Sequence, residues 1–173
     1  MRAVDFLAFK RLKSPACLIL DIRLPGINGL ALQEVMKSRG ISIPIIFITG
    51  HGDIPMSVKG IKAGAVDFLP KPFSKKKLLS AITQAIPKSI DQIKEQAEIS
   101  KIKRRIVTLS PRELEVFRLV ARGMLSKQIA FKRGTALQTI KVHRGRVMQK
   151  MKAKTVTELI RFAQKAGITS SQH

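Results

Sequence analysis

The chain has 173 residues, 45% of them apolar, and its 33 lysines and arginines outnumber 11 acidic residues to give a formal net charge of +22. No uninterrupted apolar run reaches the roughly 18 residues of a membrane span, so we expect no membrane association. The single cysteine excludes an intrachain disulfide framework, and the lack of a signal-peptide pattern predicts a cytoplasmic protein.

Continuous apolar runs in the first half of the chain predict three parallel strands, of which the first is expected to be buried on both faces and the second to be buried. These strands are expected over Ala16–Leu20, Ile41–Thr49 and Ala65–Leu69. Helical spacing predicts the surrounding helices over Met1–Ser14, through Leu30 and Met36, from the Gly50–Asp53 cap to Gly64, and over Ser74–Ile86. The alternation of strands and helices indicates an α/β domain.

The three predicted strands end in chemically distinct side chains: Asp21, Thr49 and Lys71. Open α/β sheets bind ligands at the carboxyl ends of their strands, so we expect the three side chains at one edge. Alone, each fits a structural role as a cap, a turn residue or a surface lysine. Together, at successive strand ends, they indicate a functional site.

The segments LILDIRLPGINGL, PIIFITGHGD and AGAVDFLPKPF resemble the receiver domain of bacterial response regulators, with details typical of the FixJ-like subgroup. The resemblance implies a flavodoxin-like fold in which Asp21 is the phosphoacceptor, Thr49 and Lys71 hold the phosphoryl group, and Phe68 is the switch aromatic. It also implies a cis Lys71–Pro72 bond and a sensor histidine kinase as partner. Mg²⁺ would be held by Asp21 and the carbonyl of Arg23.

The chain departs from the receiver pattern at its start. Met1 lies about where the second helix of a receiver begins, so we expect a truncated receiver that lacks two strands, one helix and the acidic pair that binds Mg²⁺. Because phosphoryl transfer depends on charge neutralisation, we expect no appreciable phosphorylation of Asp21. The Ala16–Leu20 strand is expected to have a free edge, which favours homodimerisation or association with another chain.

The segment from Pro87 to Val107 is mostly polar, with Ile90, Ile93 and Ala97 near helical spacing. This pattern predicts an exposed linker helix, and a short dimerising helix is the alternative.

Four helices are predicted over the last third of the chain. Ser110, Pro111 and Glu113 form a capping box that begins the first, and Gly123 ends it. The second begins near Ser126 and buries Ile129 and Ala130. The third runs from about Ala136 to Lys152. The fourth begins at Thr155 with a second capping box to Glu158, and is expected to bury Leu159, Ile160 and Ala163.

The third of these helices has two chemically different faces. At 100° per residue Ile140, Val147 and Met151 point inward, with His143 at the border. The opposite face carries Gln138, Lys141, Val142, Gly145, Gln149 and Lys152. Amides and lysines suit base edges in a major groove, and valine suits a thymine methyl group. Between Glu115 and Glu158 the chain has 11 cations and no acid, which favours a polyanionic partner.

The motifs SPRE, SKQIA, TIKVHR and MKAK within Leu109–Gly167 resemble the helix-turn-helix of LuxR-type regulators, whose third helix lies in the major groove. The resemblance implies base contacts by Lys141 and Val142. It implies contacts to the DNA backbone by Lys127, Thr139, Arg144 and Lys150. Four residues depart from the family pattern: Arg133 and Thr135 at usually apolar positions, Ala136 in place of a capping serine, and Leu137 in place of a polar residue.

The sequence therefore predicts a truncated receiver over 1–86, a linker helix over 87–107 and a LuxR-type DNA-binding domain over 108–173. We expect a transcription regulator of a two-component phosphorelay that binds duplex DNA. One alternative is a degenerate regulator that acts as an interaction module by pairing with an intact response regulator, and another is general nucleic-acid binding by charge alone. No Walker loop, metal-spaced Cys/His cluster or Ser-His-Asp pattern indicates an enzyme.

Overall fold

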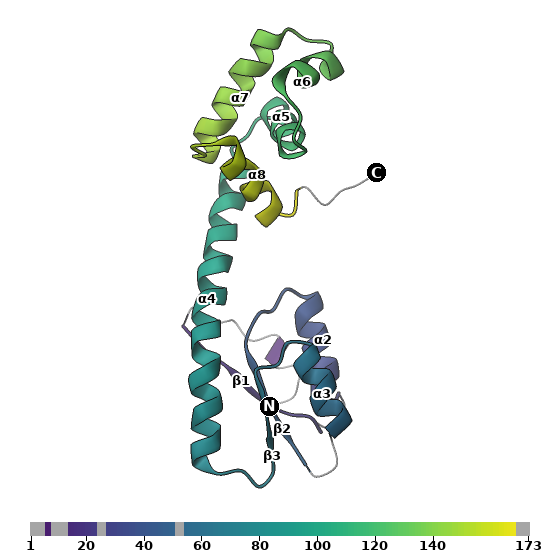
Figure 1. The fold of residues 1–173 in the computed structure, drawn as a ribbon, viewed down its shortest axis with the longest axis vertical. Coiled ribbons are helices and arrows are strands. Elements are labelled where there is room, and N and C mark those ends of the chain that lie inside the picture. The colour runs from purple at the N-terminus through teal and green to yellow at the C-terminus, as the bar shows by residue number, and fades with distance from the viewer. Residues whose placement is uncertain (1–5, 8–13, 24–26, 51–53, 169–173) are drawn as a thin grey trace. The chain divides into compact units, whose positions relative to one another are not determined.

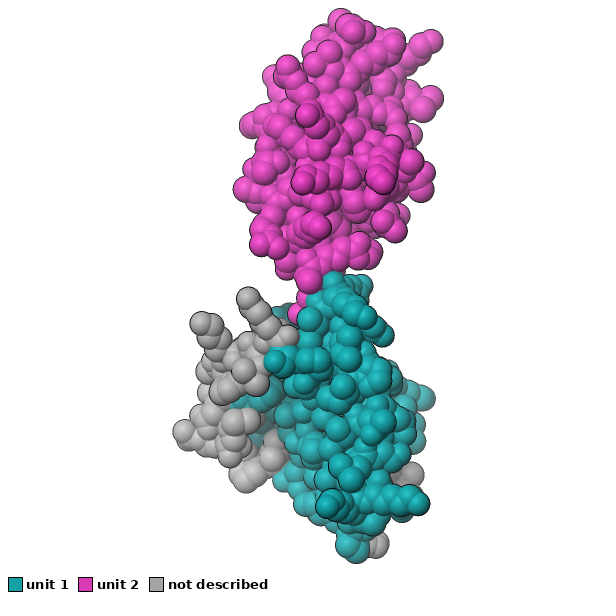
Figure 2. Space-filling model, turned by 90° about the vertical axis from the view of Figure 1, so that its left-hand side faces the viewer, with its two compact units in different colours: residues 1–95 teal, residues 96–173 magenta. Residues whose placement is uncertain are grey.

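The computed structural model describes residues 6–7, 14–23, 27–50 and 54–168. The chain divides into two compact units, residues 1–95 and residues 96–173, which Figure 2 distinguishes by colour. Phe6 and Leu7 are helical, and the rest of the helix predicted before Ser14 lies outside the described residues. The predicted cap at 51–53 also lies outside them.

The first unit contains a parallel sheet in the order β1 (Leu18–Asp21), β2 (Ile45–Thr49) and β3 (Asp67–Pro70). Helices α2 (Gly29–Ser38) and α3 (Ile54–Lys62) cover one face, and the first part of α4 (Lys75–Val107) covers the other (Figure 1). A core cluster lies on each face, with Phe47 in the first and Ile46 in the second. The three-stranded α/β architecture predicted from the apolar runs is confirmed.

The prediction that the first strand is buried on both faces is wrong, because Ile19 of β1 is 40% exposed. Ala81 and Ala85 of α4 pack against Ile46 of β2 and Leu69 of β3, and Ile19 is not part of that cluster. The apolar run identified a strand correctly, but it could not show that the covering helix lies over β2 and β3. β1 therefore presents an apolar side chain at the edge of the sheet.

Helix α4 is continuous from Lys75 to Val107, whereas the sequence predicted one helix to Ile86 and a separate linker helix after Pro87. Proline removes one backbone donor, but its φ suits a helix, so packing on both sides of Pro87 can carry the helix through it. Ala85 before it is fully buried, and Ser89 after it is buried and accepts a hydrogen bond of 3.0 Å from the Ala16 N–H.

The expectation of an exposed linker helix is also wrong for the end of α4. Ile102 is 1% exposed and lies in the core of the second unit. The guanidinium of Arg105 donates to the carbonyl oxygen of Met151 at 3.0 Å, and Lys165 pairs with Glu98 at 2.5 Å. The last turns of α4 therefore belong structurally to the second unit.

The four helices predicted for the second unit are present: α5 (Pro111–Ala121), α6 (Ser126–Arg133), α7 (Leu137–Met151) and α8 (Val156–Lys165). They pack around the largest buried side chains of the unit, which are Ile102, Phe117, Val120, Ile129, Val147, Met151 and Leu159. No helix in the described part of the chain is both long enough and apolar enough to cross a bilayer.

The first turns of α5 and α8 follow the predicted capping pattern, with one correction at α8. Ser110 and Glu113 form the predicted box at α5. At α8, Thr155 accepts a hydrogen bond from the Glu158 N–H, but the Glu158 carboxylate accepts from the N–H of Lys154 rather than of Thr155. Within α8 Phe162 is buried where Ile160 was expected, and Ile160 is only half-buried.

Candidate nucleic-acid interface and carboxylate site

The two faces predicted for the helix after the turn are present in α7. Ile140, Val147 and Met151 are buried against α5, α6 and α8. The opposite face is exposed along its length and carries Gln138, Lys141, Val142, Gly145 and Gln149. Lys152, which was expected on this face, instead follows the end of α7 as its C-cap, with φ 52°. Val142, the large apolar residue of this face, is 44% exposed. The unit thus presents a helix face that combines amides, cations and one apolar group to the solvent.

The start of α7 has no side-chain cap, as the sequence predicted from Ala136. The turn before it is tight because Gly134 adopts a left-handed conformation at φ 57°, which glycine does without steric cost. The N–H of Gly134 donates to the carbonyl oxygens of Ala130 and Phe131. These hydrogen bonds hold the turn between α6 and α7 against the end of α6.

An ion pair between exposed Lys150 and buried Glu113 fixes the other end of α7. The Nζ atom of Lys150 lies 2.6 Å from a carboxylate oxygen of Glu113 and 3.1 Å from the carbonyl oxygen of Thr108. Glu113 is 3% exposed, and its carboxylate also accepts the Ser110 N–H. These two hydrogen bonds lower the pKa of Glu113 to about 2, with that from Lys150 the larger cause. The C-terminal end of α7 is therefore held against the start of α5.

Two side chains expected to approach the DNA backbone already donate hydrogen bonds within the unit. Lys150 donates to Glu113, and Arg144 donates to the Ser126 hydroxyl oxygen at 3.1 Å. Lys127 and Thr139, the other two, are exposed on α6 and α7. The DNA-contact roles of all four residues stay predictions.

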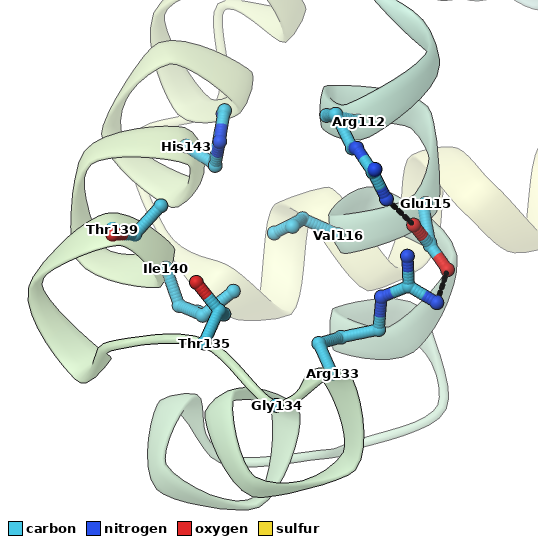
Figure 3. A pocket seen from close by; sticks show the side chains of 9 residues that line it. All are labelled: Arg112, Glu115, Val116, Arg133, Gly134, Thr135, Thr139, Ile140 and His143. Atoms are coloured by element: carbon cyan, nitrogen blue, oxygen red, sulfur yellow. Dashed lines mark ion pairs between the residues drawn. The ribbon is translucent and has the colours of Figure 1, made fainter.

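A cavity of about 310 Å³ lies beside α7, between α5 and the turn that precedes α7 (Figure 3). Arg133, which stands at a usually apolar position, pairs with Glu115 at 2.7 Å, and Arg112 lies 3.7 Å from the same carboxylate. Thr135 and Thr139 line the opposite wall. Sequence analysis missed this ion pair because Glu115 and Arg133 lie on different helices.

His143 lies at the border of the buried face, as predicted, and lines this cavity. Its Nδ1 atom is buried and has no hydrogen-bond partner among the described residues. Apart from Val116, Gly134 and Ile140, the residues that line the cavity have polar or charged side chains.

In the first unit the structure brings Asp21 and Lys71 together at the carboxyl edge of the sheet. Lys71 Nζ lies 2.6 Å from one carboxylate oxygen of Asp21, and the N–H of Arg23 donates to the other at 2.8 Å. The hydrogen bond from Lys71 is the main reason that the pKa of Asp21 is lowered, and partial burial opposes it. The carboxylate is therefore ionised and held beside a cation.

The other two residues implied by the receiver resemblance lie nearby in the sheet. Thr49 is buried at the end of β2, donates from its hydroxyl to the Gly50 carbonyl at 3.2 Å, and accepts the Lys71 N–H on its own carbonyl oxygen. Phe68 stacks on Phe47 with ring centroids 4.9 Å apart. The Lys71–Pro72 peptide bond is cis, as expected.

The described residues do not form the oxygen-rich site that Mg²⁺ requires. Within the described ranges no three His, Cys, Asp or Glu side chains gather as a metal-binding group. Both carboxylate oxygens of Asp21 already accept hydrogen bonds. No step proposed below depends on a metal ion at this edge.

Comparison with known proteins gives matches to both units. The family model of the response regulator receiver domain matches residues 2–83, and that of the bacterial regulatory proteins of the luxR family matches residues 107–163. Nodulation protein W of Bradyrhizobium diazoefficiens is 47% identical over 90% of this chain and 69% of its own length. The transcriptional regulatory protein FixJ of Azorhizobium caulinodans is 39% identical over 88% of this chain and 72% of its own length.

Among solved structures, that of the response regulator StyR aligns with a TM-score of 0.63 and 40% identity, and covers 94% of this chain and 82% of the StyR chain. The chain spans about two thirds of the length of two curated relatives, 69% of Nodulation protein W and 66% of the response regulator protein TodT of Pseudomonas putida.

Proposed function

The chain belongs to the FixJ-like response regulators, which join a receiver domain to a LuxR-type DNA-binding domain, and on that premise we propose that α7 enters the major groove of duplex DNA and reads its sequence. The single observation that carries this proposal is the contrast between the two faces of α7. One face is fully buried, and the other exposes amides, lysines and Val142.

Within this proposal the exposed residues divide into two groups. Gln138, Lys141 and Val142 lie on the outward face of α7, where hydrogen bonds and apolar contacts to base edges give specificity. Lys127 on α6 and Thr139 on α7 lie on the flanks, where contacts to phosphates give affinity without specificity. The absence of acidic residues between Glu115 and Glu158 lowers the repulsion from DNA over this whole stretch.

The test measures DNA binding by the full chain at several salt concentrations. If roughly five or six phosphates are contacted, log K against log salt should have a slope of about −5. Lys141→Ala should relax the preference between DNA sequences, whereas Lys127→Ala should weaken binding to all sequences equally. Lys101→Ala, which removes an exposed charge from α4, is the matched control and should leave the base preference unchanged.

Two results would contradict specific readout. One is a binding constant that does not change with salt, and the other is an equal loss for every DNA sequence when Lys141 is replaced. The second result would favour binding by charge alone.

We further propose that Asp21 is the phosphoacceptor position, with Lys71 and Thr49 beside it, and that a sensor histidine kinase is the corresponding partner class. The described residues bring one carboxylate to this edge, and Lys71 already neutralises it. We therefore expect little adduct when the chain is incubated with a small phosphodonor and Mg²⁺. Mass spectrometry decides this, and a stoichiometric adduct that Asp21→Asn abolishes would show that the expectation is wrong.

Exposed Ile19 supports a second candidate function, association with another chain through β1. Among the described residues β1 pairs with β2 alone, so its other edge presents backbone donors and acceptors beside an apolar side chain. Sedimentation should show concentration-dependent association that Ile19→Lys reduces while DNA binding is retained. A monomer at all concentrations would rule out this surface.

A further inference from the structure

Gly145 lies in the interior of α7 and is not required by the backbone of that helix. Five described glycines have positive φ, where a side chain would be strained, and Gly145 is not among them. Its neighbours on both sides are helical, from Leu137 to Met151. Glycine is the poorest helix former after proline, so this residue weakens the helix that carries the proposed DNA contacts.

Packing within the protein does not require this glycine either. A Cβ atom placed on Gly145 would meet no heavy atom within 4 Å. Gly29 shows the contrasting case, because a Cβ there would lie 2.7 Å from the carbonyl oxygen of Asp21. The fold therefore explains why Gly29 has no side chain, but it does not explain Gly145.

Gly145 lies on the exposed face of α7, among the side chains proposed to contact DNA. Lys141 precedes it by one helical turn, Gln149 follows it by one turn, and Val142 lies beside it, all on the exposed face. Residues three and four apart are neighbours on a helix surface, so Gly145 leaves bare backbone between three side chains suited to base edges. A glycine in such a place permits close approach of the backbone to a ligand.

We propose that Gly145 is the point where the α7 backbone approaches the floor of the major groove most closely, and that it sets the depth at which Lys141 and Gln149 reach the bases. This inference rests on the proposed entry of α7 into the groove. A methyl group at residue 145 would hold the helix away from the bases. The hydrogen bonds from Lys141 and Gln149 would then lengthen, and such bonds weaken steeply beyond their normal range.

The experiment compares Gly145→Ala, Gly145→Leu and wild type in the full chain, with a duplex that wild type enriches from a random library. Gly145→Ala should raise the melting temperature of the second unit by roughly 4 °C, since alanine favours the helix. The same substitution should weaken binding to the enriched duplex by about tenfold, the factor that corresponds to 1.4 kcal/mol. Gly145→Leu should weaken it further.

Two controls separate the failure of this inference from the failure of the proposed function. Ser100→Ala improves helix propensity at an exposed residue of α4 and should raise stability without changing affinity. Lys141→Ala tests groove entry itself. If Lys141→Ala relaxes the base preference while Gly145→Ala and Gly145→Leu bind as tightly as wild type, the role of Gly145 is refuted and groove entry stands. If wild type enriches no duplex, or Lys141→Ala changes nothing, both are refuted.

Discussion

Replacing Glu113 with glutamine is expected to destabilise the second unit strongly at neutral pH. The folded structure lowers the pKa of Glu113 to about 2 from an ordinary value of 4.5, which corresponds to roughly 3 kcal/mol in favour of the ionised form. Lys150 is more than a third exposed, so without Glu113 its ammonium group recovers part of its hydration. We therefore expect Glu113→Gln to lower the free energy of unfolding by about 2–3 kcal/mol at pH 7.

The pH dependence of this loss has a definite sign. The pKa of Glu113 is lower in the folded state, so its contribution is fully present above the ordinary value of 4.5 and is lost as the pH falls towards about 2. The difference in unfolding free energy between wild type and Glu113→Gln should consequently shrink across this window.

The measurement needs a probe that belongs to the second unit, because the chain contains neither tryptophan nor tyrosine. Amide NMR signals of the buried residues Phe117 and Val147, followed through urea titrations at several pH values, report on this unit alone. Glu95→Gln, at an exposed residue of α4 in the first unit, is the control. A loss in Glu113→Gln that stays constant from pH 7 to the acid end of the window would refute the argument from ionisation.

Three further substitutions test other parts of the structure. Ile102→Ala should lower the unfolding free energy of the second unit by about 2–4 kcal/mol in the same urea titration, because it removes buried methyl groups. Val107 is 85% exposed, so Val107→Ala should change this free energy little. Lys71→Ala should raise the pKa of Asp21 towards its ordinary value, as measured by carboxyl carbon NMR, and Lys75→Ala should leave it unchanged. Gly29→Ala should destabilise the first unit by about 1–3 kcal/mol in thermal unfolding, because the new Cβ atom would lie 2.7 Å from the Asp21 carbonyl oxygen. Gly50→Ala should not destabilise this unit, because a Cβ atom there would meet no heavy atom within 4 Å.

Local patterns in the sequence predicted those features that depend on neighbours along the chain. The periodicity of α7 identified Ile140, Val147 and Met151 as buried, and the S-x-x-E spacing identified the cap formed by Ser110 and Glu113. In each case successive residues of the pattern lie within one or two helical turns of one another. Such features follow from helix geometry before any tertiary contact forms.

The meeting of Asp21 and Lys71 was predicted because parallel strands end at one edge of a sheet, but other contacts between distant side chains were not predicted. Lys150 reaches Glu113 across 37 residues, and Arg133 reaches Glu115 on another helix, so no local spacing indicates either pair. Pro87 is a helix-boundary signal in the sequence, yet packing of Ala85 and Ser89 continues α4 through it. The exposure of Ile19 depends on which strands α4 covers, and this is a property of the whole sheet.

The last turns of α4 determine where the second unit can be joined to the input domain of another regulator. Glu98 pairs with Lys165 of α8, Ile102 lies in the core of the second unit, and Arg105 donates to the carbonyl oxygen of Met151. A recombination junction between Arg105 and Leu109 would separate these three residues from the unit that they stabilise. A junction before Glu98 keeps those contacts with the helices they stabilise. A chimaera that joins this DNA-binding unit to another input domain should therefore keep the stability of the unit only when the junction lies before Glu98.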